Sequence, residues 1–184
     1  MPHSMHDDVE KILFTADQIE ERVGALGKQI TADYAGRDPH LVTIVKGSIP
    51  FLADLMRVID TPLSVDLFGI ASYEGESSSG EVRLTKDLDD PVEGRHVVVV
   101  EDIIDTGLTL AYVLRNLRQR APASVKVVTF LDKPSGRGTP ISADYVGFTI
   151  PDDFVVGYGL DWNQHYRNLP YVGILRRDVY AGPR

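Results

Sequence analysis

The sequence contains no cysteine among its 184 residues. This absence excludes disulfide bonds, a thiolate nucleophile and cysteine metal sites, and it fits a reducing compartment. No apolar run approaches the roughly 20 residues that span a bilayer, and the first residues show no signal-peptide pattern. We therefore expect a cytoplasmic protein without a membrane partner. Met5 is a candidate for the natural start, behind a short cloning remnant.

The sequence also lacks an excess of positive charge. Its formal net charge is −8, which argues against general nucleic-acid binding. An anionic substrate would then need local help, for which a divalent cation held by carboxylates is suited. Internal repeats and long low-complexity segments are absent as well. With 43% hydrophobic residues, the chain is long enough for one domain, 1–184, with a real core.

The stretch 97–110 organises the rest of the chain. Four consecutive valines, 97–100, predict a strand buried on both faces, as in a parallel sheet. The strand runs into Glu101 and Asp102, and a short polar turn follows at 105–107. A helix is predicted next, with one apolar face. That face consists of Leu110, Val113, Leu114 and Leu117.

The end of this strand suits a phosphate site. Open parallel sheets bind ligands beyond the carboxyl ends of their strands. Thr106 and Thr109 offer hydroxyls, Gly107 allows close approach, and the helix start supplies free N–H groups. The two acids would repel a phosphate unless they hold sugar hydroxyls or a metal. The alternative interpretation is an acidic helix start with a threonine cap.

Strands and helices alternate through most of the chain. A capping box at Thr15 predicts a first helix, and Pro50 a second whose core face includes Met56. This order predicts an α/β fold with a parallel core, at about 37–142. The flanking segments should form a small second lobe, or hood, at about 1–36 and 143–184. The predicted strands are 41–45, 65–71, 82–84 (paired with 65–71), 97–100, 125–131, 143–150 and 172–175.

Residues 101–109, Glu-Asp-Ile-Ile-Asp-Thr-Gly-Leu-Thr, resemble the phosphoribosyl-pyrophosphate (PRPP) motif of the purine phosphoribosyltransferases, specifically the hypoxanthine/guanine branch. Leu108 stands where other members have Lys, but that position would present its backbone N–H. A second string, 154–161, with Arg167 six residues later, also matches the family. With Lys46-Gly47 and Lys133, the resemblance extends over about 41–175.

The resemblance implies transfer of the 5-phosphoribosyl group from PRPP to hypoxanthine or guanine, with Mg²⁺ as cofactor, in purine salvage. Glu101 and Asp102 would hold ribose hydroxyls, directly or through Mg²⁺. Residues 105–109 would hold the 5′-phosphate, and Asp105 would be the general base. The bland alternative for Asp105 is a helix N-cap. Family members are usually dimers or tetramers, so a homodimer or homotetramer is expected.

The remaining roles also come from the resemblance. Lys133 would donate to the 6-oxo group of the purine, Phe154 would stack on the base, and Val155 would offer main-chain groups. Taken alone, these are an ordinary loop lysine and a core aromatic. The pyrophosphate would be bound by Lys46, Gly47 and Arg167, while Asp161 would lie on the purine side and bind Mg²⁺. Ser72 and Tyr73 would open a lid loop.

Other functions are less well supported. A phosphoacceptor receiver domain also carries an acid pair and a Lys-Pro, but its pair ends the first strand, and here at least two strands precede the pair. A non-catalytic regulator that binds PRPP or RNA conflicts with retention of the catalytic set and with the acidic charge. A transferase for xanthine, adenine or a pyrimidine is the nearest competitor. A P-loop enzyme is excluded because Gly-x-x-x-x-Gly-Lys-Ser/Thr is missing.

Overall fold

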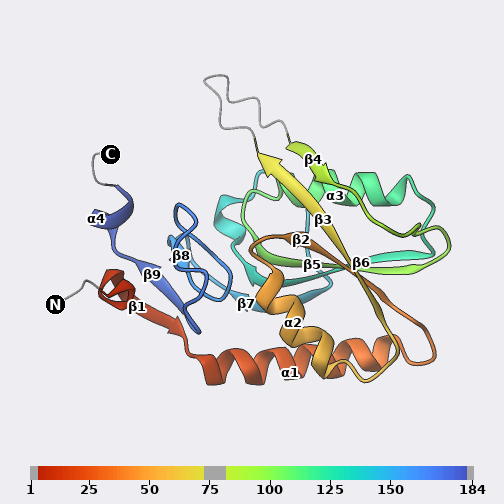
Figure 1. The fold of residues 1–184 in the computed structure, drawn as a ribbon, viewed down its shortest axis with the longest axis horizontal. Helices are drawn as coiled ribbons and strands as arrows, with labels where there is room; N and C mark the ends of the chain where they lie inside the picture. The colour runs from red at the N-terminus through yellow and green to blue at the C-terminus, as the bar shows by residue number, and fades with distance from the viewer. Residues whose placement is uncertain (1–3, 73–81, 182–184) are drawn as a thin grey trace.

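The computed structural model describes residues 4–72 and 82–181. Its strands form two separate sheets, one of six strands and one of three. The larger sheet carries helices on both faces, and the smaller sheet lies to one side of it, next to both chain ends (Figure 1). This is the predicted α/β architecture with a mostly parallel core.

The six-stranded sheet has the order β4-β3-β2-β5-β6-β7. Its strands are parallel, except that β4 runs antiparallel to β3. The pairing of 82–84 with this strand was predicted, but its direction was not. Strand β5 lies at the centre and is buried on both faces, as the valine run predicted. Val98 and Val100 belong to one core cluster, and Val97 and Val99 to the other. The bounds are β2 His40–Val45, β3 Ser64–Ser72, β4 Val82–Lys86, β5 His96–Ile104, β6 Ser124–Asp132 and β7 Tyr145–Thr149.

Helices cover the two faces of this sheet. Helices α1 (Ala16–Asp33) and α2 (Ile49–Val58) pack on one face, and α3 (Leu108–Arg118) on the other (Figure 1). The predicted capping box is present, because Thr15 Oγ1 accepts from the Gln18 N–H at 3.3 Å and Gln18 Oε1 accepts from the Thr15 N–H at 2.9 Å.

One predicted core residue of α2 was wrong. Met56 is 40% exposed, whereas Phe51, Leu52 and Leu55 are buried. Met56 directly follows Leu55, so it lies about 100° around the helix, beyond the buried stripe. The remaining short elements are η1 (Met5–Asp8), η2 (Pro134–Gly136) and α4 (Arg177–Tyr180).

The three-stranded sheet has the order β1-β9-β8 and is antiparallel. It joins β1 (Val9–Phe14) to β8 (Val155–Val156) and β9 (Val172–Leu175), so both ends of the chain contribute, as expected for the hood. The core and the hood do not divide at the expected residues 36 and 143. Helix α1, expected in the hood, packs on α2, and β7, also expected in the hood, pairs with β6 in the larger sheet. The division of the chain into domains stays a prediction.

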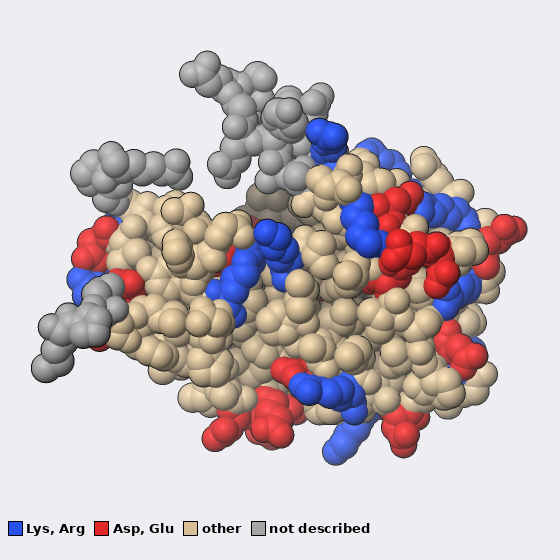
Figure 2. Space-filling view, viewed as in Figure 1, with Lys and Arg blue, Asp and Glu red and all other residues tan. Residues whose placement is uncertain are grey.

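The surface carries charges of both signs. On the face shown in Figure 2, acidic and basic side chains are interspersed, and no broad basic patch forms there. Within residues 4–72 and 82–181, no helix is long and apolar enough to cross a membrane.

Candidate active site

The carboxyl ends of β5 and β6 bring two predicted site residues together. Ile104 is in register with Asp132, so the residues that follow, Asp105 and Lys133, are neighbours. Lys133 Nζ lies 2.9 Å from Asp105 Oδ2 and 3.0 Å from Asp152 Oδ1. Burial opposes the charge of Lys133, but the two carboxylates outweigh it and raise the pKa of Lys133. The ammonium is therefore charged at neutral pH.

Glu101 is buried and Asp102 is half-buried, and both lie near the end of β5. Glu101 is 6% exposed, and its Oε2 has no hydrogen-bond partner among the described residues. Burial, and then the charge of Asp102, raise the pKa of Glu101 well above its usual range. Burial also raises the pKa of Asp102 to about 6, although the Ile103 N–H donates to its carboxylate. Such carboxylates lack the donors or cations that would stabilise their charge.

A small hollow lies in the turn after these acids. It has a volume of about 230 Å³ and is lined by residues 101–107 together with Thr109 and Leu110. Helix α3 begins here at Leu108, and the first N–H groups of a helix have no partner within it. The loop after β6 braces the turn, because Thr139 Oγ1 donates to the Thr106 carbonyl at 2.9 Å. The hollow thus has the lining expected of a phosphate site. A larger cavity, of about 510 Å³, lies between α1 and α2 and contains none of the predicted site residues.

Lys46 and Gly47 lie between β2 and α2, against the acid pair. A Cβ atom at Gly47 would lie 1.7 Å from Asp102 Oδ2, so any other residue there would require the Asp102 carboxylate to move. The backbone of this loop therefore packs against the side chain of Asp102.

Asp161 and Arg167 approach the same acids from the other lobe. Arg167 Nη2 lies 2.7 Å from Asp161 Oδ1, and Arg167 Nη1 donates to the Gly159 carbonyl at 2.7 Å. The charge of Arg167 lowers the pKa of Asp102 and that of Asp161 raises it, although burial dominates. The second predicted motif and the first thus meet in space.

Phe154 and Val155 are placed on the second sheet. Phe154 stacks on Tyr180 of α4, with ring centroids 4.8 Å apart, and meets Trp162 edge-on at 5.4 Å. Val155 is buried and pairs with Ile174 of β9. Phe154 is therefore part of an aromatic cluster, as the bland interpretation expected, and whether it also stacks on a base stays a prediction.

The lid prediction is only partly covered by the structure. Ser72 is the last residue of β3. Tyr73 and the loop that follows it lie outside the described residues.

Two residues of the site were missed from the sequence. Asp152 pairs with Lys133, and its place just after β7, at another strand end, was a signal that could have found it. Arg137 ion-pairs with Asp132 and donates from Nη2 to the Ile104 carbonyl at 3.1 Å. Arg137 thereby links the residue before Asp105 to the residue before Lys133. A lone arginine in a Gly/Pro loop gives no such signal in the sequence.

Comparison with known families agrees with this arrangement. The sequence model of the phosphoribosyl transferase domain matches residues 11–163. The chain belongs to the phosphoribosyltransferase family. Its predicted PRPP motif and the second string both lie within the matched range.

Individual relatives refine the placement. A hypoxanthine-guanine phosphoribosyltransferase of Bacillus subtilis (strain 168) is 50% identical over 96% of this chain and 98% of that protein. A crystal structure of a hypoxanthine phosphoribosyltransferase from Staphylococcus aureus superposes with a TM-score of 0.93 at 46% identity, covering 98% of each chain. A bifunctional TilS/HprT protein of Listeria innocua is 51% identical over 97% of this chain, which spans only 28% of that protein's length. The chain therefore falls in the hypoxanthine/guanine branch of the family.

Proposed function

We propose that this phosphoribosyltransferase transfers the 5-phosphoribosyl group of PRPP to hypoxanthine or guanine, giving the nucleoside monophosphate and pyrophosphate in purine salvage. A purine nitrogen attacks the anomeric carbon of PRPP. The bond between that carbon and the pyrophosphate oxygen breaks, and the proton on the nitrogen leaves. The carbon gains positive character on the way, as in glycoside cleavage.

The ion pair between Asp105 and Lys133 is the single observation that carries this proposal, with 2.9 Å between Nζ and Oδ2. A carboxylate and an ammonium at the carboxyl ends of two adjacent strands supply the two groups that a 6-oxopurine needs. Asp105 accepts the proton from the attacking nitrogen. Lys133 donates to the 6-oxo group and has no such acceptor on a 6-aminopurine, which selects against adenine. Phe154 and Val155 would contact the base.

The sugar and phosphates would occupy the rest of the site. The hollow at 105–109 suits the 5′-phosphate, since Thr106, Thr109 and the N-terminus of α3 supply donors. Glu101 and Asp102 would accept hydrogen bonds from ribose hydroxyls, and the pyrophosphate group would meet Arg167 together with the loop at 46–47.

A Mg²⁺ ion fits the acids of this site. Glu101 has a buried oxygen without a partner among the described residues, and the pKa of Asp102 is raised to about 6. Mg²⁺ is usually held by one or two carboxylates plus substrate phosphates. No cluster of three or more potential metal ligands occurs within residues 4–72 and 82–181, which is compatible with that habit. Glu101, Asp102 and Asp161 are the candidate ligands. One or two of them, together with substrate phosphates, would hold the ion, which when bound neutralises charge on the departing pyrophosphate.

The test of this function is nucleotide formation from PRPP and Mg²⁺, with hypoxanthine, guanine, xanthine, adenine and uracil offered separately. We expect product from hypoxanthine and guanine and none from adenine or uracil. Product only from another base would overturn the base site and keep the phosphate site. No product from any base, with PRPP still bound, would identify a regulator instead. The expected homodimer or homotetramer is tested by light scattering of the same preparation, and cytoplasmic location by cell fractionation.

Lys133→Ala tests the base contact itself. We expect kcat/KM for hypoxanthine and guanine to fall about 10- to 100-fold, because one charge-assisted hydrogen bond is lost. Lys126→Ala is the matched control, since Lys126 lies on β6, the strand that leads to Lys133, and pairs with Asp33 at 3.4 Å, away from Asp105. Unchanged kinetics for both oxopurines in Lys133→Ala would end this assignment.

A further inference from the structure

The turn 157–160 has an unusual backbone. Gly157, Tyr158 and Gly159 all have positive φ, at 98°, 49° and 100°. Glycine adopts this region freely, but a bulky residue such as tyrosine rarely does. Tyr158 must therefore be held there by its surroundings.

Side-chain contacts hold Tyr158 on the core of the larger sheet. Its ring is buried, with its centroid 4.7 Å from that of Phe130 on β6. Its hydroxyl donates to Asp54 Oδ2 on α2 at 2.6 Å. Asp54 also forms an ion pair with Arg57, one turn later on the same helix. The phenol thus connects the turn to the helix that directly follows Lys46-Gly47.

The next residue connects the turn to the predicted pyrophosphate site. The Gly159 N–H donates to the Arg167 carbonyl at 3.0 Å, and the Gly159 carbonyl accepts from Arg167 Nη1 at 2.7 Å. A Cβ atom at Gly159 would lie 1.9 Å from the Gly47 carbonyl oxygen. Gly159 is thus packed between two of the groups that would bind pyrophosphate, and Tyr158 is its neighbour.

We propose that Tyr158 is a positioning residue that uses its hydrogen bond to Asp54 to hold Gly159 against the Gly47 loop, and so holds Arg167 in place for the pyrophosphate group of PRPP. This inference rests on the proposed function. Tyr158 touches no substrate in this scheme. Its hydroxyl fixes the spacing between α2 and the turn, and this spacing sets where the guanidinium of Arg167 lies.

The first test is Tyr158→Phe, which keeps the ring and removes only the hydroxyl. We expect KM for PRPP, and the Kd of pyrophosphate measured by calorimetry, to rise about five-fold, as the loss of one hydrogen bond allows. KM for hypoxanthine should stay within about two-fold of the wild-type value, because Asp105 and Lys133 lie on other elements. If the hydroxyl of Tyr158 only stabilised the fold, its removal would not change KM for PRPP more than KM for hypoxanthine.

The partner gives a second test. Asp54→Asn keeps an oxygen that accepts from the phenol and should resemble the wild type. Asp54→Ala removes the acceptor and should reproduce Tyr158→Phe. Combining Asp54→Ala with Tyr158→Phe should add little, since both remove the same bond. Full additivity in the double variant would overturn the proposal.

Tyr145→Phe is the matched control. Tyr145 is also buried, and its hydroxyl donates to Asp33 Oδ2 at 2.5 Å, at the opposite end of the strands. We expect it to lower the melting temperature without raising KM for PRPP. The inference fails if Tyr145→Phe gives the same split as Tyr158→Phe, or if Tyr158→Phe moves both KM values equally or neither. If the wild type makes no nucleotide, the proposed function fails instead, and unequal pyrophosphate binding by the wild type and Tyr158→Phe would still support the role of Tyr158.

Discussion

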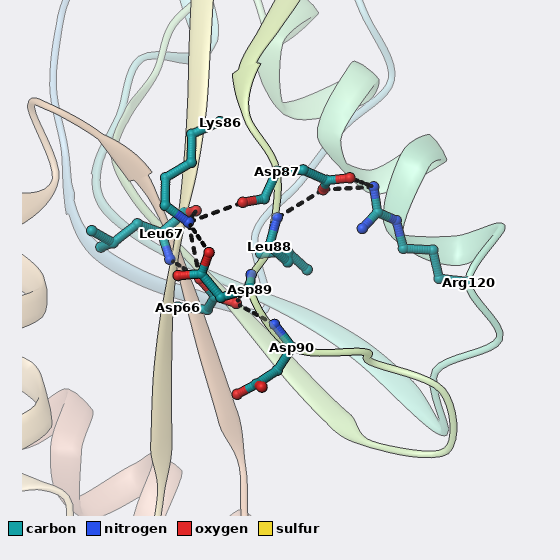
Figure 3. A network of polar contacts seen from close by, with 8 residues as sticks. All are labelled: Asp66, Leu67, Lys86, Asp87, Leu88, Asp89, Asp90 and Arg120. Carbon is teal, nitrogen blue, oxygen red and sulfur yellow. Dashed lines mark hydrogen bonds and ion pairs between the residues drawn. The ribbon is translucent and has the colours of Figure 1, made fainter.

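Asp66 and the acid pair Glu101-Asp102 lie on strands of the same sheet, with Asp66 and Glu101 buried and Asp102 half-buried, yet the charges of the two sites are stabilised to different extents. Asp66 accepts the N–H groups of Leu67 and Asp89 at 2.7 Å each and that of Asp90 at 3.2 Å (Figure 3). Lys86 Nζ lies 3.6 Å from its carboxylate. Burial opposes ionisation of Asp66, but these donors outweigh it and lower its pKa.

Within the described part of the chain, the acid pair has no comparable set of donors. Burial raises the pKa of both acids, to about 6 for Asp102 and well above the usual range for Glu101. A buried acid that is fully hydrogen-bonded stabilises the fold, whereas one that is not makes the fold less stable when it ionises. The comparison indicates that Asp66 stabilises the fold, and it agrees with the proposal that the acid pair binds a ligand that brings hydroxyls or a cation.

The largest effect on activity is expected at Asp105, which lies shortly after the acid pair, and it tests the division between structural and functional acids. Asp105→Asn keeps an oxygen near Lys133 but removes the basic carboxylate. We expect kcat to fall about 100-fold or more, with little change in PRPP affinity or melting temperature. Asp87→Asn is the control, because Asp87 lies in the Asp66 network and pairs with Arg120 at 2.8 Å. Unchanged turnover in Asp105→Asn would remove Asp105 as the base.

The next effect is expected in stability rather than activity. Asp66→Asn should lower the free energy of unfolding by about 2 kcal/mol at pH 7, because an amide cannot accept all the N–H groups that converge there. Turnover should not change. Since the folded pKa of Asp66 is lowered, its contribution is present above the ordinary carboxyl pKa and is lost as pH falls through the folded value.

Urea unfolding at pH 7 and near pH 3 measures this difference. The gap between the wild type and Asp66→Asn should narrow at the lower pH. An equal gap at both pH values would show that shape, not charge, makes Asp66 stabilising. A fall in turnover of Asp66→Asn would contradict the proposed division, in which Asp66 stabilises the fold and the acid pair binds the ligand.

The acid pair could be located from the sequence, and the Asp66 network could not. The valine run fixed β5, and ligand sites lie at the carboxyl ends of parallel strands, so Glu101 and Asp102 were placed correctly at the edge of the sheet. Apart from the adjacent Leu67 N–H, the donors to Asp66 come from residues 86–90, which fold back beside β3. Neither the hydrophobic pattern of the strands nor the spacing of residues in the sequence predicts that 86–90 fold back beside β3.

Other contacts also divide into those that the sequence helps to predict and those that it does not. Asp105 and Lys133 were each assigned to the base site through the family resemblance, but their ion pair was not predicted; parallel register explains why the two residues meet. Tyr158 and Asp54 are 104 residues apart and meet only because the second sheet docks beside α2. Local periodicity predicts elements and their ends, while contacts between distant loops depend on packing that one sequence does not reveal.

The smallest effect is the sharpest test of the comparison, because its sign is opposite to that of Asp66→Asn. The folded pKa of Glu101 is raised, so its ionisation costs stability as pH rises through that value. Glu101→Gln should therefore stabilise the substrate-free protein by about 1 kcal/mol at pH 8, or about 2–4 °C in melting temperature. The gain should vanish near pH 5, and affinity for PRPP with Mg²⁺ should fall. A lower melting temperature at pH 8 would mean that Glu101 already has a stabilising partner in the free protein, and the two acidic sites would then no longer differ in kind.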